Sequence, residues 1–226
     1  MLIDAGSDVT VVDSNSDSIL QIILLRESLY RNLKLVTFLL QHGCNISSDY
    51  AAAVIHRCIF CQEFRLFSIL VEFGGFVPTL LKQRAYLISK TLIEYANPFC
   101  MVKNSKFVKF HDIFSPLCTA FLCGKLKLAR NMVNACYMTT SDLYLLPYRS
   151  NLRDSLKHQN KTESLAYLDE LSSCAPTLMQ LSFIKVSELI GSGPSRKKKV
   201  DQLNLPTSLK RHLMFESANR VFLDVE

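Results

Sequence analysis

Apolar residues recur at the spacing of an α-helix along most of the chain, and glycines interrupt the pattern. One predicted helix ends at Gly43, and its apolar face is formed by Leu35, Val36, Leu39 and Leu40. The same apolar run closed by glycine occurs at Gly6 and at Gly74. Glycine readily adopts the positive φ that ends a helix, so each of these positions predicts a helix end. The expected fold class is all-α.

The first of these glycines gives the chain an unusual start. Gly6 closes an apolar run that begins at Leu2, so the chain is expected to open inside the second helix of a pair. Such a helix would lack its partner. That fits either a longer parent chain or an edge that another element covers.

The helices closed by glycine recur at a nearly regular interval. Gly6 and Gly43 are 37 residues apart, and Gly43 and Gly74 are 31 residues apart. These spacings bracket about 33 residues, which is the period of the ankyrin repeat. A short insertion within residues 28–32 would account for the longer first interval.

Motifs at the predicted helix starts agree with this interval. The segment 115–136 resembles an ankyrin repeat, because its Ser-Pro-Leu-Cys-x-Ala matches the Thr-Pro-Leu-His-x-Ala that opens the first helix of a repeat. Gly124 then takes the position between the two helices. Residues 53–56 and 18–21 match the same motif more loosely.

The resemblance implies an ankyrin-repeat solenoid over residues 1–140, in which each helix pair buries one face against the next. It would hold about four repeats, the first incomplete and one, within residues 75–114, degenerate. Helical patterns continue through residues 141–175 without the repeat motif, and we expect connecting helices there.

The next predicted helix, over residues 178–190, is the most informative one. Its apolar face would be formed by Leu178, Leu181, Ser182, Val186, Leu189 and Ile190. Periodicity alone leaves two interpretations open. The helix is either the last one of the stack or a docking helix that binds a partner.

The segment 176–215 resembles a SOCS box, a small three-helix module that recruits elongin B, elongin C and a cullin. The family's elongin-binding pattern, Ser/Thr-Leu-x-x-x-Cys-x-x-x-aliphatic, is matched by Thr177, Leu178, Leu181, Ser182 and Val186. The family's variable loop would correspond to residues 192–199. Its cullin-selecting pattern is matched over residues 200–213, and the residues expected to contact cullin are Leu203, Leu205, Pro206 and Leu209. Residues 216–226 would form a tail.

Two positions depart from the SOCS box pattern. Ser182 replaces a buried cysteine, and its hydroxyl would weaken elongin C binding by about 1–2 kcal/mol where it finds no partner. Asn204 replaces the first proline of the cullin-selecting pattern, which bears on the choice of cullin.

Pro206 is expected to start the last helix, with Leu209 and Leu213 facing inwards.

An ankyrin stack followed by this module is the order found in the ankyrin repeat and SOCS box proteins. The resemblance implies a non-catalytic, substrate-recognition subunit of a cullin-RING ubiquitin ligase, with partners elongin C, elongin B and cullin 5 and a target protein on the ankyrin face. One alternative is an ankyrin scaffold whose degenerate box recruits no elongins. Another is a truncated form that occupies targets or elongins without productive assembly.

Charge and hydropathy argue against nucleic-acid and membrane partners. The net charge is +6, but the run Arg196–Lys199 supplies four of these charges. A nucleic-acid-binding face needs basic residues spread along a stripe. We interpret the run as a solvated loop, with a nuclear-import signal or a patch for an acidic partner as alternatives. With no signal peptide or membrane span and with eight cysteines, we expect reduced thiols in the cytoplasm or the nucleus.

The remaining candidate chemistry lies at residues 56–61. Cys58-x-x-Cys61 lacks the further ligands that a structural zinc site needs, so we predict small buried side chains and no metal there. His56 occupies the place of the ankyrin histidine, where the family's imidazole bonds neighbouring backbone, and thiol catalysis with a cysteine is the weaker alternative. No cofactor is expected. The chain has no motif of an enzyme active site.

Overall fold

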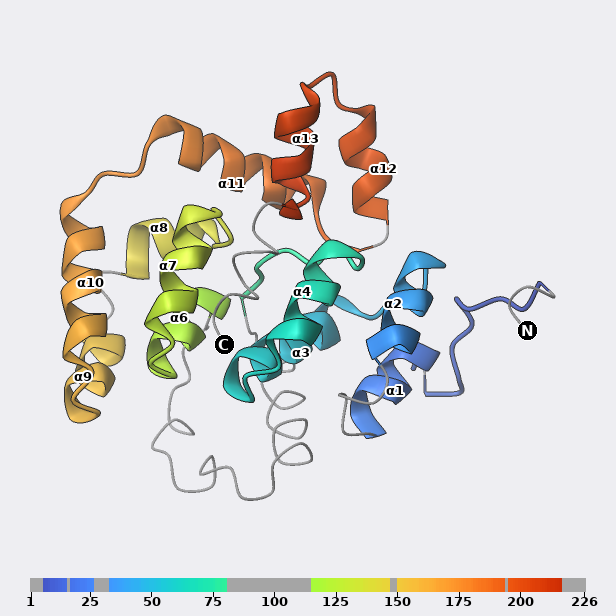
Figure 1. The fold of residues 1–226 in the computed structure, drawn as a ribbon, viewed down its shortest axis with the longest axis horizontal. Helices are drawn as coiled ribbons and strands as arrows, with labels where there is room; N and C mark the ends of the chain where they lie inside the picture. The colour runs from blue at the N-terminus through green and yellow to red at the C-terminus, as the bar shows by residue number, and fades with distance from the viewer. Residues whose placement is uncertain are drawn as a thin grey trace.

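The computed structural model describes residues 6–15, 17–26, 33–80, 115–146, 150–193 and 195–216. Within these ranges the chain forms twelve helices and no strand, so the all-α prediction is confirmed (Figure 1). The helices are α1 (Ile19–Arg26), α2 (Leu33–Gln41), α3 (Ser48–Phe60), α4 (Phe64–Glu72), α6 (Pro116–Leu122), α7 (Leu126–Asn134), α8 (Thr140–Leu145), α9 (Ser150–His158), α10 (Thr162–Ser173), α11 (Leu178–Ile190), α12 (Ser195–Gln202) and α13 (Thr207–Leu213).

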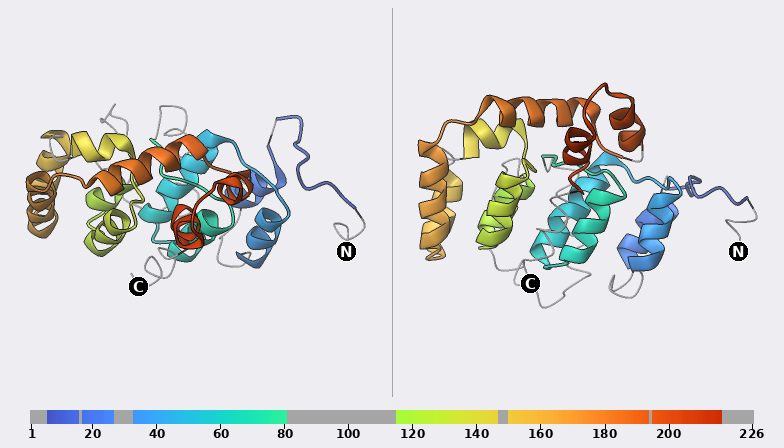
Figure 2. Two further views of the ribbon diagram at one scale, coloured as in Figure 1. Left: turned by 90° about the horizontal axis from the view of Figure 1, so that it is seen from above. Right: turned by 45° about the horizontal axis from the view of Figure 1, so that its top comes forward.

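Eight of these helices form a stack of four pairs, which lie in a row (Figures 1 and 2). The pairs are α1–α2, α3–α4, α6–α7 and α9–α10. Neighbouring pairs contact each other through α2 and α4, through α3 and α6, and through α6 and α9. Their buried side chains join in one hydrophobic cluster, which includes Leu39, Phe67, Leu117, Phe121 and Leu168. No pair could bury its apolar faces alone, so neighbouring pairs stabilise one another.

Three of the pairs share one turn geometry. Their three-residue turns are 61–63, 123–125 and 159–161, and the middle residues Gln62, Gly124 and Asn160 have φ of 61°, 69° and 52°. In each turn the backbone N–H of the third residue donates to the carbonyl five positions earlier, at 2.8–2.9 Å. Of the three middle residues, only Gly124 is a glycine. Residues 150–173, expected to be connecting helices, therefore contain a further pair of the stack.

Positive φ near residue 74 belongs to a different glycine than the sequence predicted. Gly43 has a φ of 85°, as expected after α2, but after α4 it is Gly75, with a φ of 60°, that takes this conformation. At Gly74 a Cβ atom would lie 2.6 Å from the carbonyl oxygen of Leu70 and 2.7 Å from the Phe76 ring. Gly74 is therefore needed because the chain approaches itself closely.

Several predictions fall outside the described residues. They concern the chain start at 1–5, the insertion at 28–32, most of the degenerate repeat at 75–114 and the tail beyond 216. Of the elements on either side of the degenerate repeat, α3 packs directly against α6. The pairs α3–α4 and α6–α7 are thus immediate neighbours in the stack.

The start of α6 also fixes the position of α8. Ser115 caps α6, because its hydroxyl accepts a hydrogen bond from the backbone N–H of Cys118 at 3.0 Å, and Pro116 follows as the first helical residue. The same hydroxyl donates to the carboxylate of Asp142 at 2.5 Å. Asp142 in turn accepts from the backbone N–H and the hydroxyl of Thr139 in the capping box that starts α8. One buried carboxylate therefore links the N-terminal ends of two helices.

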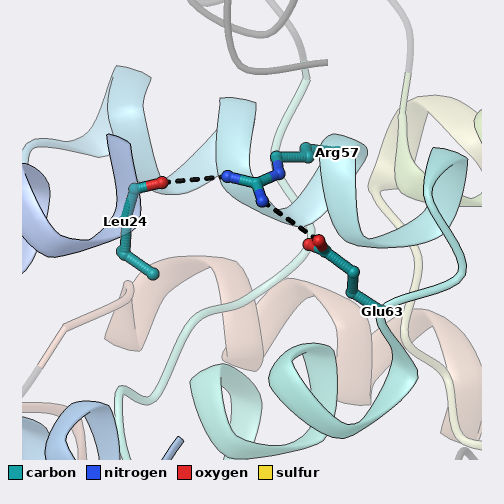
Figure 3. A network of polar contacts seen from close by, with 3 residues as sticks. All are labelled: Leu24, Arg57 and Glu63. Atoms are coloured by element: carbon teal, nitrogen blue, oxygen red, sulfur yellow. Dashed lines mark hydrogen bonds and ion pairs between the residues drawn. The ribbon is translucent and has the colours of Figure 1, made fainter. Parts of the chain in front are cut away.

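A buried ion pair joins three parts of the stack (Figure 3). Arg57 on α3 donates to the carbonyl oxygen of Leu24 on α1 at 2.9 Å and to the carboxylate of Glu63, just before α4, at 3.0 Å. Both charged side chains are buried. Burial raises the pKa of Glu63, and the nearby Arg57 opposes that rise.

The last three helices, α11 to α13, form a module that we call the C-terminal module, residues 177–216. After α10 the chain turns back, and α11 crosses one edge of the row before α12 and α13 follow (Figure 2). A smaller hydrophobic cluster of Ile190, Val200 and Leu213 holds its three helices together. No helix in the described part of the chain is long and apolar enough to span a membrane.

Candidate functional site

Helix α11 has one face buried by its own chain and one apolar face left open. It begins at a capping box, in which the Thr177 hydroxyl accepts from the backbone N–H of Gln180 and the Gln180 side chain accepts from the backbone N–H of Thr177. It ends at Gly191, whose φ is 78°. The buried face is formed by Ile184, Ser187 and Ile190.

Contacts from two directions hold the buried face of α11. Ile184 belongs to the hydrophobic cluster of the stack. The Glu188 carboxylate accepts from the backbone N–H of Thr140 at 2.8 Å and from its hydroxyl at 2.6 Å, so it also satisfies a free N–H in the first turn of α8. The Phe183 ring lies 4.5 Å from that of His212 and 6.0 Å from that of Phe215. The helix is therefore fixed with its other face outwards.

The open face carries the residues predicted to bind elongin. Thr177 and Ser182 are exposed, Leu181 is half-buried, and Leu178 and Val186 are 79% and 37% exposed. Leu189 continues the same face and is 77% exposed. We call this surface the α11 stripe, formed by Leu178, Leu181, Ser182, Val186 and Leu189. Ile190, expected on the same face, is instead buried against α12 and α13.

Such a surface is unusual for a helix packed on a stack. Burying one exposed leucine side chain contributes about 1.5–3 kcal/mol, and the α11 stripe leaves two leucines more than three-quarters exposed on one face. The exposed Ser182 and Lys185 lie on the same face, and exposed leucines grouped in this way indicate an interaction site. An apolar helix face of this spacing fits a hydrophobic groove of a partner protein.

The residues predicted to contact cullin lie between the end of α12 and the first turn of α13. Leu205 and Leu209 are 36% and 46% exposed, Pro206 is exposed, and Leu203 is half-buried against the small cluster. Pro206 directly precedes α13, as predicted. The prediction that both Leu209 and Leu213 face inwards was wrong for Leu209, which is 46% exposed, whereas Leu213 packs with Ile190 and Val200 in the small cluster.

The basic run 196–199 was predicted to be a solvated loop, and this was wrong. It lies within α12, where the side chains of Lys197, Lys198 and Lys199 are exposed and that of Arg196 is only 1% exposed. A run of four like charges suggests solvation for all four. The helix, however, turns one of them inwards, as every helix does with a side chain on its buried face.

Arg196 joins the C-terminal ends of two helices. Its guanidinium donates to the carbonyl oxygens of Ser187 at 3.0 Å and Gly191 at 2.6 Å, at the end of α11, and to that of Leu213 at 2.8 Å, at the end of α13. It also donates to the Ser187 hydroxyl. The Ser187 carbonyl also accepts from the backbone N–H of Gly191 at 3.3 Å. A cation at a helix C-terminus, where carbonyl oxygens are exposed, is favourable. Burial lowers the pKa of Arg196 to about 10, so the guanidinium stays charged at neutral pH.

His56 is a buried link between neighbouring pairs. Its Nδ1 lies 2.7 Å from the hydroxyl oxygen of Thr119, which joins α3 to α6. Burial lowers the pKa of His56 to about 3, against the opposing effect of the Thr79 backbone. The imidazole thus contacts a side chain of the next pair in addition to the backbone of Thr79.

Acid is therefore expected to destabilise the fold through His56. Below pH 6.5 the unfolded chain binds a proton at this residue that the folded chain does not bind, so stability falls as pH falls. At pH 5 the loss is about 2 kcal/mol, from 1.36 kcal/mol per pH unit. Urea unfolding at pH 7 and pH 5 measures it. In His56→Gln the loss should be smaller by about this amount, and in His158→Gln, at an exposed histidine, it should be unchanged.

The two cysteines of Cys58-x-x-Cys61 differ in their surroundings. Cys58 is fully buried on α3, and burial raises the pKa of its thiol well above the usual value, which opposes formation of a nucleophilic thiolate. Cys61 lies half-buried in the turn before α4. Among the described residues, no group of three or more His, Cys, Asp or Glu side chains is placed to hold a metal ion.

The chain was compared with protein-family models, with curated proteins and with solved structures. None of the three comparisons gave a significant match.

Proposed function

We propose that the chain is the substrate-recognition subunit of an elongin B/C–cullin-RING ubiquitin ligase. The observation that carries this proposal is the α11 stripe: Leu178, Leu181, Ser182 and Val186, which resemble the elongin-binding pattern, share the open face of one capped helix. The rear of that helix is held by the same chain. The docking surface is thus formed before any partner binds, which lowers the entropic cost of association.

The remaining parts fit the same proposal. The stack of helix pairs would be an ankyrin solenoid that binds the target protein, because three of its pairs repeat one turn geometry and the pair α6–α7 carries the ankyrin-like motif. Leu205, Pro206 and Leu209, exposed beside α11, would contact cullin 5. The chain itself performs no chemistry in this scheme. It raises the effective concentration of target lysines near a charged ubiquitin-conjugating enzyme, as a tether does.

Both residues that depart from the SOCS box pattern, Ser182 and Asn204, are exposed. Ser182 lies in the middle of the α11 stripe and is exposed, so its hydroxyl would enter the partner's groove. Asn204 is exposed in the short connection between α12 and α13. The first departure acts on elongin affinity and the second on cullin choice.

Leu178→Asp is expected to abolish stable binding of the elongin B–elongin C complex. A carboxylate at this position would be buried without a partner in an apolar groove, and a loss of at least 2 kcal/mol, or about 30-fold in Kd, follows. The measurement is co-purification of the full chain with both elongins, followed by titration calorimetry. Leu178 is 79% exposed in the free chain, so the variant should fold normally.

Val11→Asp is the matched control, because Val11 is also highly exposed, at 62%, and precedes α1, outside the C-terminal module. It should bind elongins like the wild type. Equal losses in both variants would contradict a specific role of the α11 stripe. Failure of the wild-type chain to bind, with the fold intact, would sink the ligase proposal in favour of a scaffold without elongin partners.

A further inference from the structure

A narrow seam joins the C-terminal module to the stack at two glycines. Gly75 follows α4 in the stack, Gly193 follows α11 in the module, and the N–H of Gly193 donates to the carbonyl oxygen of Gly75 at 3.3 Å. A Cβ atom on Gly75 would lie 2.9 Å from the carbonyl oxygen of Gly193 and 3.1 Å from Cβ of Arg196. The two backbones therefore approach more closely than any side chain would allow.

Aromatic contacts continue the seam on the module side. The Phe215 ring, directly after α13, lies 5.0 Å from the ring of Tyr137 in the stack, edge to face. The guanidinium of Arg196 lies 5.7 Å from the Phe215 ring. Tyr137 itself is buried, and its hydroxyl donates to the carbonyl oxygen of Phe76 in the stack. Phe215 thus connects the arginine that binds α11 and α13 to the core of the stack.

We propose that this seam, formed by Gly75, Tyr137, Gly193, Arg196 and Phe215, sets the orientation of the α11 stripe relative to the stack. Arg196 and Phe215 act as positioning residues. Arg196 holds the ends of α11 and α13 together, and Phe215 sets the position of this unit on the stack. The contact between Thr140 and Glu188 fixes α11 at a second point along its length, so the helix cannot swing about the seam alone.

The consequence for recognition rests on the proposed function. A target bound to the stack and an elongin pair bound to the α11 stripe would be held at one fixed angle. Which target lysines reach the ubiquitin-conjugating enzyme would then depend on the seam, because a tether of fixed geometry favours only the sites that it can present.

The test is Gly75→Ala, which places a methyl group inside the seam. Gly43→Ala is the matched control, because Gly43 also has a positive φ, of 85°, but a Cβ atom there would meet no atom within 4 Å. Both variants carry the same type of backbone strain, and only one acts on the seam. Amide hydrogen exchange of the free full chain, followed helix by helix, reads out the effect.

In Gly75→Ala, exchange in α11, α12 and α13 should accelerate roughly tenfold over that in Gly43→Ala, while exchange in α3, α6 and α7 stays within about twofold. Equal exchange in the module of both variants would overturn the proposal. So would an acceleration spread evenly over stack and module, since that would be a loss of global stability only.

Phe215→Leu is the second variant, for the case that Gly75→Ala does not fold. It removes the ring contacts with Tyr137 and Arg196 and keeps an apolar side chain, so the same selective acceleration in α11–α13 is expected. Unchanged exchange there would again contradict the proposal.

A separate titration with the elongin B–elongin C complex distinguishes the two proposals. The α11 stripe lies on the face of α11 opposite Ser187, where Arg196 binds. The Kd of the seam variants should therefore stay within about threefold of that of the wild type, as for substitutions outside an interface. If no elongin binds even to the wild type, the proposed function fails, and the exchange experiment still decides whether the seam positions the module.

Discussion

Replacing Arg57 with methionine is expected to lower the free energy of unfolding by about 3–5 kcal/mol. Arg57 forms an ion pair with the buried Glu63 carboxylate at 3.0 Å, and it also satisfies the carbonyl oxygen of Leu24 (Figure 3). Methionine fills much of the same volume but leaves the carboxylate charged, buried and unpaired. Removing one partner of a buried pair is far more costly than removing both.

Denaturant unfolding followed by circular dichroism measures this loss. Arg65→Met, at an exposed position on α4, is the control and should change stability by no more than about 0.5 kcal/mol. The double variant Arg57→Met/Glu63→Leu should recover most of the loss, because no charge then remains buried. A single variant as stable as the wild type would show that Glu63 does not depend on Arg57.

The pH dependence of the Arg57→Met deficit provides a second check. Burial already raises the pKa of Glu63, and loss of the guanidinium raises it further. A carboxyl group whose folded pKa lies above its unfolded value is destabilising once pH rises through that range. The deficit relative to the wild type should therefore be larger at pH 7 than at pH 5.

Arg196→Met should have a comparable effect, with a loss of about 3–5 kcal/mol in the free energy of unfolding. The guanidinium donates to three carbonyl oxygens at the ends of α11 and α13. That of Ser187 also accepts from the Gly191 N–H, whereas those of Gly191 and Leu213 would lose this donor, and each buried acceptor left without a partner costs about 1–3 kcal/mol. The loss should concentrate in the C-terminal module. Thermal unfolding and amide exchange of the same sample show its size and its location.

Lys197→Met is the matched control for this prediction. Lys197 is the next residue of α12, carries the same charge and is exposed. Its replacement should change stability by at most about 0.5 kcal/mol. Equal effects of the two substitutions would mean that the basic run acts through its net charge and that the buried hydrogen bonds of Arg196 contribute little.

The local signals of the sequence were reliable where the interactions themselves are local. Ser115 and Thr177 cap α6 and α11 through hydrogen bonds to residues three positions away, and Gly43 takes a positive φ after α2. Such interactions involve groups within one helical turn, so the order of residues alone determines them. That Leu178, Leu181, Ser182, Val186 and Leu189 share one face of α11 also follows from helical spacing.

Residue type alone did not identify every residue with a positive φ. Gln62 and Asn160 take the same positive φ as Gly124, although only the glycine gave a signal. The helices α9 and α10 lie within residues 141–175, where helices were expected, and the turn between them carries no glycine. A turn that is stabilised by packing between pairs tolerates a residue other than glycine, since that packing offsets the local cost.

Burial was the property that only the tertiary structure decided. The sequence by itself determined the helices, their caps and the face that each helix offers. The structure decided that Arg196 lies inside and three neighbouring lysines outside, that Ile190 is covered and Leu189 is not, and that Gly75 meets Gly193. These outcomes depend on contacts between different helices: Arg196 and Ile190 are buried against residues of α11 to α13, and the contact between Gly75 and Gly193 joins residues 118 positions apart. Local spacing fixes which side chains share a face, whereas long-range packing fixes which face meets water.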